Sequence, residues 1–315
     1  MNTALTFVVL AERYLAERRA LGFGLRIAGQ RLLAFARFAD ARGSIVPLTE
    51  AVAVEWARHE TRPSPLTWGR RVEIVRPFAS WLRQHDPRTE VPPVRLFGKV
   101  HRRLSPHVYA ESEVLAILRE AARLSPPDGL RPASVATLLG LLACTGMRVS
   151  EALALRRDDV DLDESLVIVR LTKFHKSRLV PLHPSAVRAL RRYVALRDQR
   201  SPGTAPAAFF VIDGGIALTY SKVRTAFRRI RIQLAWEHVS GRRPRVHDLR
   251  HTFACRRLLR WHKQKIGGEY RILDLSTYLG HAKVSDTYWY LSGFPELMAV
   301  AARQFERFAR ADGRP

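Results

Sequence analysis

Two short β-type runs, SLVIVRL (165–171) and SRLVPL (177–182), stand in a chain whose other regular segments nearly all have helical spacing. The five residues TKFHK separate the two runs, and this pattern predicts a β-hairpin. A further short strand is expected at FFVI (209–212), ended by an Asp-Gly-Gly turn. The sequence therefore predicts a mainly α fold with a small β-sheet, of the α+β class.

The first ninety residues contain four segments with apolar residues at helical spacing. The first segment, FVVLAERYLAERRALG, stops at Gly22, and the second, LRIAGQRLLAFARFADARG, stops at Gly43. Thr49 is placed to cap a third helix, and Ser64 followed by proline is a typical start for a fourth. Four short helices predict a small helical domain over residues 1–90.

Residues 91–108, VPPVRLFGKVHRRLSPHV, combine proline, glycine and basic residues without a sustained period. Such a composition predicts an extended basic linker. Residues 109–315 are then expected to form a second domain, in which helices surround the hairpin. Its expected helices include 111–122, an apolar segment that breaks at Thr145-Gly146, a new start near Val149, and 221–236, 249–263, 272–278, 285–291 and 295–310.

The chain is strongly basic. It has 53 Lys and Arg against 29 Asp and Glu, a formal net charge of +24, and both the first hundred residues and the remainder are basic. A GC-rich genome would explain the preference for Arg over Lys, but it would not explain the shortage of acids. The imbalance therefore predicts a polyanionic partner.

The cysteine content and the hydropathy of the chain indicate the cellular compartment in which we expect the protein. Cys144 and Cys255 each lie inside an apolar segment, which argues against a disulfide framework and fits a reducing cytoplasm. No Lys or Arg precedes Arg13, so the basic start of a signal peptide is missing, and no apolar run reaches membrane-spanning length. We expect a cytoplasmic protein without a membrane partner.

Several segments carry charged side chains that packing does not require. In TGMRVSEAL, Arg148 stands at an expected helix start, where a cation opposes the helix dipole. Glu151, one turn further on, is placed to hold the Arg148 guanidinium. Lys173 lies in the hairpin, where an isolated lysine is usually a solvated turn residue.

The segment HDLRHTFA places His247, Arg250 and His251 on one face of an expected helix. The two histidines also have the spacing of a zinc pair. However, Asp248 stands where zinc proteases have glutamate, and no third ligand is evident, so we predict no metal. A fourth segment, LGHAKVSDTYWY (279–290), contains a histidine and two tyrosines.

Together these segments resemble the tyrosine recombinase (phage integrase) family. The shared pattern is T-G-x-R-x-S-E at a helix start, a hairpin lysine, H-x-x-R, and L-G-H with a tyrosine nine residues after the histidine. The matching positions are Arg148, Lys173, His247, Arg250, His281 and Tyr290. The resemblance covers about residues 105–300 and implies that the helical first domain is a core-binding (SAM-like) DNA-binding domain.

The resemblance implies that the chain cuts and rejoins double-stranded DNA through a 3′-phosphotyrosyl intermediate. Attack by tyrosine creates a crowded, highly charged phosphorane, whose non-bridging oxygens two arginines, Arg148 and Arg250, can clamp. His281 would add a hydrogen bond, His247 is the candidate base, and Lys173 is the candidate acid for the leaving 5′-hydroxyl. The phosphotyrosyl bond conserves energy, so no cofactor, ATP or metal is expected.

Two assignments retain an alternative. Tyr290 has the family spacing from His281, whereas on a helix Tyr288 would lie about 200° away around the axis. We therefore predict Tyr290 as the nucleophile and Tyr288 as a packing residue or phosphate contact. The hairpin lacks the glycine that usually follows the family lysine, which leaves Lys176 as the alternative to Lys173.

Further basic residues are expected to contact DNA phosphates. A solvated helix face is the usual interpretation of a charge run, but residues 214–236 contain no acid. The expected contacts come from the linker, the hairpin, one helix and the segment before His247. They are Lys99, Arg102, Arg103, Lys176, Lys222, Arg224, Arg228, Arg229, Arg242, Arg243 and Arg245.

The resemblance also implies a tetramer on two DNA sites, assembled with sibling recombinases where a mobile element encodes several. The expected helix 295–310 would dock on its own domain or on a neighbouring subunit. We thus expect a nucleoid-associated recombinase that integrates or excises a mobile element. The alternatives are a type IB topoisomerase, which the same chemistry would serve, and a DNA-binding regulator with an inactive site.

Overall fold

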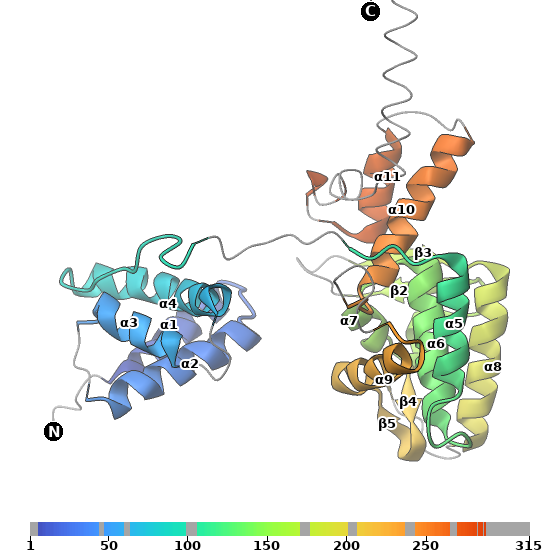
Figure 1. Cartoon of the computed structure of the whole chain (residues 1–315), viewed down its shortest axis with the longest axis horizontal. Helices are drawn as coiled ribbons and strands as arrows, with labels where there is room; N and C mark the ends of the chain where they lie inside the picture. The colour runs from blue at the N-terminus through green and yellow to red at the C-terminus, as the bar shows by residue number, and fades with distance from the viewer. Residues whose placement is uncertain are drawn as a thin grey trace, which may run out of the picture. The chain divides into compact units, whose positions relative to one another are not determined.

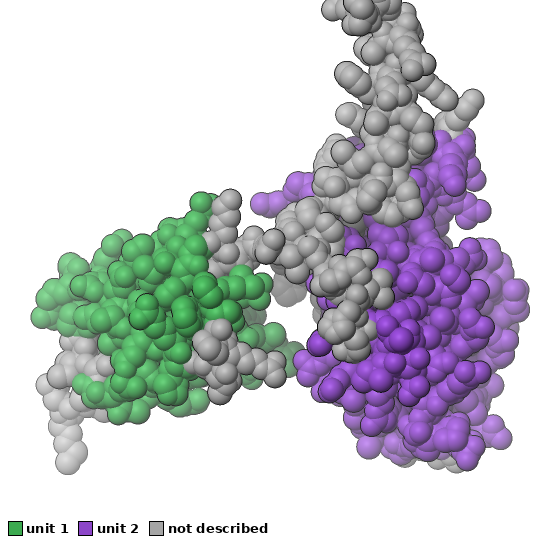
Figure 2. Space-filling view, viewed as in Figure 1, with its two compact units in different colours: residues 1–104 green, residues 105–315 purple. Residues whose placement is uncertain are grey.

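The computed structural model of the chain describes most of its residues in two compact units, 1–104 and 105–315, which are coloured separately in Figure 2. The described residues are 6–43, 47–59, 64–98, 106–170, 177–200, 207–236, 243–264, 270–281, 283–285 and 287. Within this part of the chain, no helix combines the length and apolar character that a bilayer span requires.

The described part of the first unit is helical, as predicted, and its helices are blue to cyan in Figure 1. They are α1 (Phe7–Ala20), α2 (Arg26–Ala41), α3 (Glu50–Arg58) and α4 (Pro65–His85). Ser64 caps α4 by accepting a hydrogen bond of 3.1 Å from the backbone nitrogen of Thr67. Phe35, Trp56 and Phe78 are buried where the helices meet. The predicted helical composition of this region is therefore confirmed.

The first residues of the segment expected as a linker contact the first unit. Residues 91–98 do not run free of the first unit, because the ring of Phe97 packs edge-on against Trp68 of α4, with 5.5 Å between ring centres. Such isolated contacts hold a proline-containing segment in place without a helical period. The basic part of the expected linker, with Lys99, Arg102 and Arg103, lies outside the described residues.

The second unit contains seven α-helices among its described residues. They are α5 (Glu111–Ala122), α6 (Leu130–Thr145), α7 (Val149–Leu153), α8 (Pro184–Arg200), α9 (Tyr220–Gln233), α10 (Asp248–Lys263) and α11 (Tyr270–Leu279). The short strands between them are β1 (Val160–Asp161), β2 (Leu166–Val169), β3 (Arg178–Pro181), β4 (Val211–Ile212) and β5 (Ile216–Ala217).

The strands form two small antiparallel sheets, ordered β1-β2-β3 and β4-β5. In the first sheet β2 pairs with β3 in a register that joins Leu166 to Pro181 and Val169 to Arg178. The predicted hairpin strands and the mainly α fold are therefore confirmed. Strands β1 and β5 were not predicted, because neither stands in a continuous apolar run as long as the FFVI run that contains β4.

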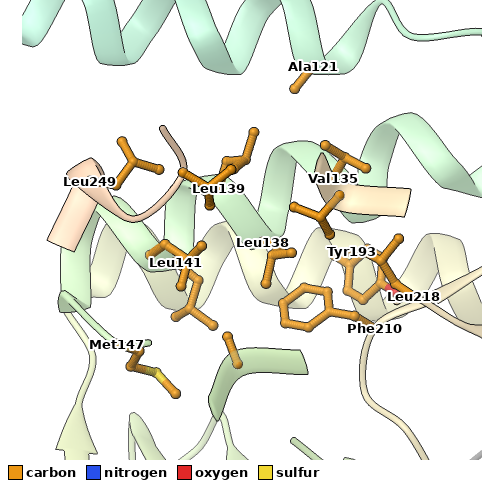
Figure 3. Packing of buried hydrophobic residues seen from close by; sticks show 14 of the residues in the cluster. Ala121, Val135, Leu138, Leu139, Leu141, Met147, Tyr193, Phe210, Leu218 and Leu249 are labelled. Carbon is orange, nitrogen blue, oxygen red and sulfur yellow. The ribbon is translucent and has the colours of Figure 1, made fainter. Parts of the chain in front are cut away.

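Helix α6 lies at the centre of the second unit and packs against α5, α8 and α10. Figure 3 shows Leu138 and Leu139 of this helix among other buried side chains, including Tyr193 and Phe210. The helix is apolar around most of its circumference, which is the pattern of a helix buried on several sides. Its end therefore has a fixed position, from which α7 starts.

A smaller apolar cluster joins α10 to α11. Its buried members include Phe253, Leu258, Leu275 and Leu279. The ring of Tyr278 stacks on Phe253 at 5.7 Å between centres. This packing places the end of α11 beside the start of α10.

The first residues of the second unit bind to α10. The backbone nitrogen of Tyr109 donates to Oγ1 of Thr252 at 2.9 Å, and the Tyr109 hydroxyl donates to the carbonyl of Arg245 at 2.9 Å. Arg256 in turn donates to the Tyr109 carbonyl at 2.7 Å. The entering chain is thus tied to the first three turns of α10 and to the residues before them.

Candidate active site

The two motif arginines meet at the turn that precedes His281. Arg250 donates from Nη2 to the carbonyl of Leu279 at 2.8 Å, and Arg148 donates from Nη2 to the carbonyl of Gly280 at 3.0 Å. The two guanidiniums therefore hold consecutive peptide units, and the next residue in the chain is His281. Three motifs that are far apart in the sequence come together at this point.

The T-G step positions both arginines. Gly146 ends α6 with a φ of +64°, a conformation that glycine adopts without strain. Its carbonyl accepts a hydrogen bond of 2.8 Å from Nη1 of Arg250. Arg148 follows two residues later and precedes the first residue of α7. The end of α6 is thus the common support of the two guanidiniums.

Glu151 holds Arg148, as the sequence predicted. Its Oε1 accepts from Nη1 of Arg148 at 2.7 Å, and its Oε2 accepts from the Arg148 backbone nitrogen at 2.9 Å. The second contact is one half of a capping box, in which an acid in the first turn binds back to the helix start. The side chain of Arg148 remains 29% exposed, so the held guanidinium still reaches solvent.

Arg178 of β3 also binds Glu151, and this residue was missed by the sequence analysis. Its Nη2 donates to Oε2 at 2.7 Å and its Nη1 to Oε1 at 3.2 Å. Burial alone would raise the pKa of Glu151, but hydrogen bonds from Arg178 and Arg148 outweigh burial and lower the pKa to about 2. One signal in the sequence pointed to burial. Arg178 stands two positions before the buried Val180, so the two side chains lie on the same, core-facing side of β3.

His281 is oriented by the end of α11. Gly280 has a φ of +67°, and the backbone nitrogen of His281 then donates to the carbonyl of Ser276 at 3.0 Å. Nδ1 of His281 lies 2.7 Å from Oγ1 of the buried Thr287, within hydrogen-bond distance. The L-G-H motif is therefore a helix-terminating turn that fixes the imidazole ring.

His247 precedes α10 and stacks edge-on with His251, with 4.8 Å between ring centres. Desolvation and the neighbouring Arg250 lower the pKa of His247 below its usual value. Desolvation and His247 lower the pKa of His251 to about 3. Both imidazoles are therefore neutral near pH 7, which is the state that a proton acceptor requires.

Asp248, which stands in the glutamate position of a zinc motif, has a structural partner. It is buried and accepts a hydrogen bond of 2.8 Å from Nη2 of Arg245. In the described part of the chain, no three His, Cys, Asp or Glu side chains cluster as metal ligands would. The guanidinium of Arg245 is expected to contact DNA, and it also stabilises the first turn of α10 through this hydrogen bond to Asp248.

The basic residues of α9 fall into two groups. Arg224 and Arg228 are exposed and four residues apart, so they lie on one side of the helix. Lys222 and Arg229 lie on another side, roughly 100° or more around the axis from Arg228. The four residues, predicted together, therefore do not form one continuous stripe. Arg243 is exposed, in the segment before α10.

Several predicted site residues lie outside the described residues. They are Lys173, Lys176, Arg242, Tyr288 and Tyr290, together with the helix expected at 295–310. Their assignments remain predictions.

A family model described as the phage integrase family matches residues 108–295, which is more than half of the chain. The chain belongs to this family, the tyrosine recombinases. The matched region contains the described residues that converge on the turn at Gly280, and it also contains Lys173 and Tyr290.

Relatives match over most of their length. The chain is 36% identical over 307 residues to y4rB of Sinorhizobium fredii, a protein assigned by name to the integrases/recombinases, covering 96% of this chain and 98% of that protein. It is 30% identical over 279 residues to the tyrosine recombinase XerC of Xanthomonas campestris pv. campestris, covering 87% and 80%.

Two solved structures share the fold. The Tn1549 transposon integrase, in complex with transposon right end DNA, has a TM-score of 0.67 at 18% identity, and the match covers 97% of this chain and 100% of that chain. The XerH site-specific recombinase, bound to a palindromic difH substrate, has a TM-score of 0.63 at 20% identity, covering 90% and 80%.

Proposed function

We propose that the protein is a site-specific recombinase that breaks and rejoins double-stranded DNA through a 3′-phosphotyrosyl intermediate on Tyr290. The observation that carries the proposal is the meeting of Arg148 and Arg250 on the two peptide units before His281. Glu151 binds both Arg148 and Arg178, so the cluster contains three arginines and one glutamate and has an excess of positive charge. Such a cluster suits a phosphate group.

In the proposed reaction, the tyrosine oxygen attacks the phosphorus and the bond to the 5′-oxygen breaks. His247 accepts the tyrosine proton, because its lowered pKa keeps the imidazole neutral. Arg148, Arg250 and His281 stabilise the charge on the non-bridging oxygens. Lys173 donates a proton to the departing 5′-oxygen. Rejoining is the reverse reaction with the 5′-hydroxyl of a second strand, and no cofactor or metal enters either step.

The proposed assembly is a tetramer on two DNA sites, with sibling recombinases as further partners. The named functions of the relatives support a DNA substrate, since one solved neighbour is in complex with transposon DNA and another with difH DNA. The first unit would act as the core-binding domain, residues 99–105 as part of a basic linker, and the helix expected at 295–310 as a subunit contact. A mobile element in the bacterial nucleoid is the proposed setting, and the cytoplasm is the proposed compartment.

A nicked suicide duplex tests the central step. Cleavage releases a short 5′-hydroxyl fragment from such a duplex, so the phosphotyrosyl product cannot be resealed and is seen as a slower band on a denaturing gel. With excess chelator present, we expect covalent product from the wild type and from Tyr288→Phe, but none from Tyr290→Phe. All three proteins should bind the duplex equally.

Two results would contradict the proposal in different ways. Trapped protein with Tyr290→Phe but none with Tyr288→Phe would reverse the assignment of the nucleophile. Binding without covalent product by the wild type, on any site taken from the flanks of the gene, would indicate the regulator instead.

A further inference from the structure

Glu151 binds more donors than are needed to hold Arg148. Its two carboxylate oxygens accept four hydrogen bonds, two from Arg148 and two from Arg178. A carboxylate has about four lone-pair positions, so this group is saturated. The side chain of Glu151 is only 7% exposed, and a buried carboxylate requires such compensation.

The second arginine changes the charge of the cluster. Arg148 and Glu151 alone would form a neutral pair, and the carboxylate would cancel the charge that Arg148 presents to a phosphate. Arg178 compensates the same carboxylate from the other side, with its own side chain 13% exposed. The three groups together therefore retain one positive charge. Of the two arginine side chains, that of Arg148 is the more exposed.

Arg178 also touches the turn that Arg148 binds. A Cβ added to Gly280 would lie 3.0 Å from Nη1 of Arg178 and 3.3 Å from its Cζ, so the guanidinium packs directly against this glycine. The carbonyl of the same residue accepts from Nη2 of Arg148. Arg178 thus packs between Glu151 and Gly280, the two groups that orient Arg148.

We propose that Arg178 is a positioning residue for DNA cleavage, which binds the Glu151 carboxylate so that Arg148 is held against Gly280 with its charge uncompensated. Arg178 acts through Glu151 and does not contact the DNA. The inference rests on the proposed recombinase function, since it assigns a task within that reaction. It also links β3, the second strand of the hairpin whose sequence contains Lys173, to the arginine motif.

The test measures single-turnover formation of the covalent product at saturating suicide duplex. Arg178→Gln should lower the rate by about 100-fold, as expected when a reacting group is displaced by about 1 Å. Its affinity for the duplex should stay unchanged. The matched control is Arg197→Gln, because Arg197 is also a buried arginine of the second unit, where it donates to the Phe209 carbonyl at 3.2 Å. Arg197→Gln should cleave at close to the wild-type rate.

A double-mutant cycle separates positioning from a general loss of structure. If Arg178 acts through Glu151, then Arg178→Gln should have little further effect in a Glu151→Gln background, since residues that act as a unit are not additive. Fully additive losses would overturn the proposal. An equal loss in Arg197→Gln would also overturn it, because the effect would then be general destabilisation.

Two other results bear on different claims. A lowered DNA affinity of Arg178→Gln with an unchanged rate at saturation would make Arg178 a phosphate contact and refute the positioning role. A wild type that forms no covalent product contradicts the proposed function, whereas an active wild type with an equally active Arg178→Gln contradicts only this inference.

Discussion

Gly146 lies so close to Phe253 that a Cβ added to the glycine would overlap ring carbon Cδ1 and stand 2.9 Å from Cγ. The backbone at Gly146 also has a positive φ, +64°. Two independent requirements, space and conformation, therefore select glycine at this position. Because Arg250 and Phe253 lie on the same helix, the close approach is also what brings the Arg250 guanidinium to the carbonyl of Gly146.

Gly146→Ala should destabilise the second unit by roughly 1–3 kcal/mol, the usual cost of overpacking a core, and strain at positive φ adds to it. It should also reduce DNA cleavage, because α10 must move away. Urea unfolding measures the change. Gly140→Ala is the control, since its added Cβ would meet only a Leu118 methyl at an ordinary 3.7 Å. Alanine at a helix interior position should there be neutral or stabilising by about 1 kcal/mol or less. Equal unfolding midpoints for the two variants would contradict the packing argument.

Lys173 and Lys176 can be separated by the leaving group. An alkoxide needs a donated proton, but a thiol has a pKa of about 8.5 and leaves as the thiolate. Lys173→Ala should therefore cleave ordinary DNA very slowly and a duplex with a bridging 5′-sulfur at close to the wild-type rate. Lys176→Ala should resemble the wild type on both substrates.

Arg148→Ala is the control for this experiment, since a group that stabilises the non-bridging oxygens should not be rescued by sulfur. Rescue of Lys176→Ala, and not of Lys173→Ala, would show that the other hairpin lysine is the acid. Rescue of neither variant, with both still folded and slow on ordinary DNA, would point to His247.

The buried Glu151 carboxylate should contribute to acid stability. Its pKa is about 2 in the folded chain, below the value of about 4.3 expected for an unfolded chain. The ionised group therefore stabilises the fold above about pH 4.3, and this contribution is lost as the pH falls toward 2. The difference in unfolding free energy between the wild type and Glu151→Gln should be largest near pH 6 and shrink below pH 4. Urea unfolding at several pH values measures it, and a difference independent of pH would rule out this account.

Duplex binding should weaken steeply with salt, because the net charge of +24 implies several phosphate contacts. Each contact adds about −0.9 to the slope of log K against log salt. Arg228→Ala should make the slope less negative by about that amount. Arg188→Ala removes another exposed arginine, from α8, and should leave the slope unchanged. Identical slopes for the two variants would remove α9 from the proposed DNA-binding surface, and fluorescence anisotropy provides the measurement.

The helix ends were predictable where the backbone admits few residue types. Gly22, Gly43 and Gly146 all have positive φ at the end of a helix, and each was read as a terminator from its place after an apolar period. The hairpin was predictable for a similar reason, because alternation and composition are local signals. The meeting of Arg148 with the turn at Gly280 was expected only from the family pattern, since no local signal links residues 132 positions apart.

Arg178 shows what local pattern leaves out. Its partner Glu151 is 27 positions earlier in the sequence. An arginine in a hairpin strand is ordinarily solvated. Its spacing of two residues from Val180 indicated that the side chain is buried. That spacing could not identify the acid that neutralises the arginine. The packing of Phe97 on Trp68 was missed for the same reason, because a contact between two aromatic rings leaves no period in the sequence.

The attachment of Tyr109 makes α10 one of the elements through which mechanical load would enter the second unit. Its hydrogen bonds with Thr252 and Arg256 join the incoming chain to α10, and its hydrogen bond to Arg245 joins it to the segment before that helix. Tension along the segment before Tyr109 would therefore reach α10, whose first turn carries Arg250, and also α5, because Nε2 of His107 lies 3.2 Å from Oε2 of Glu113. The helix that carries Arg250 of the candidate site is thus also a helix to which the start of the second unit is tied.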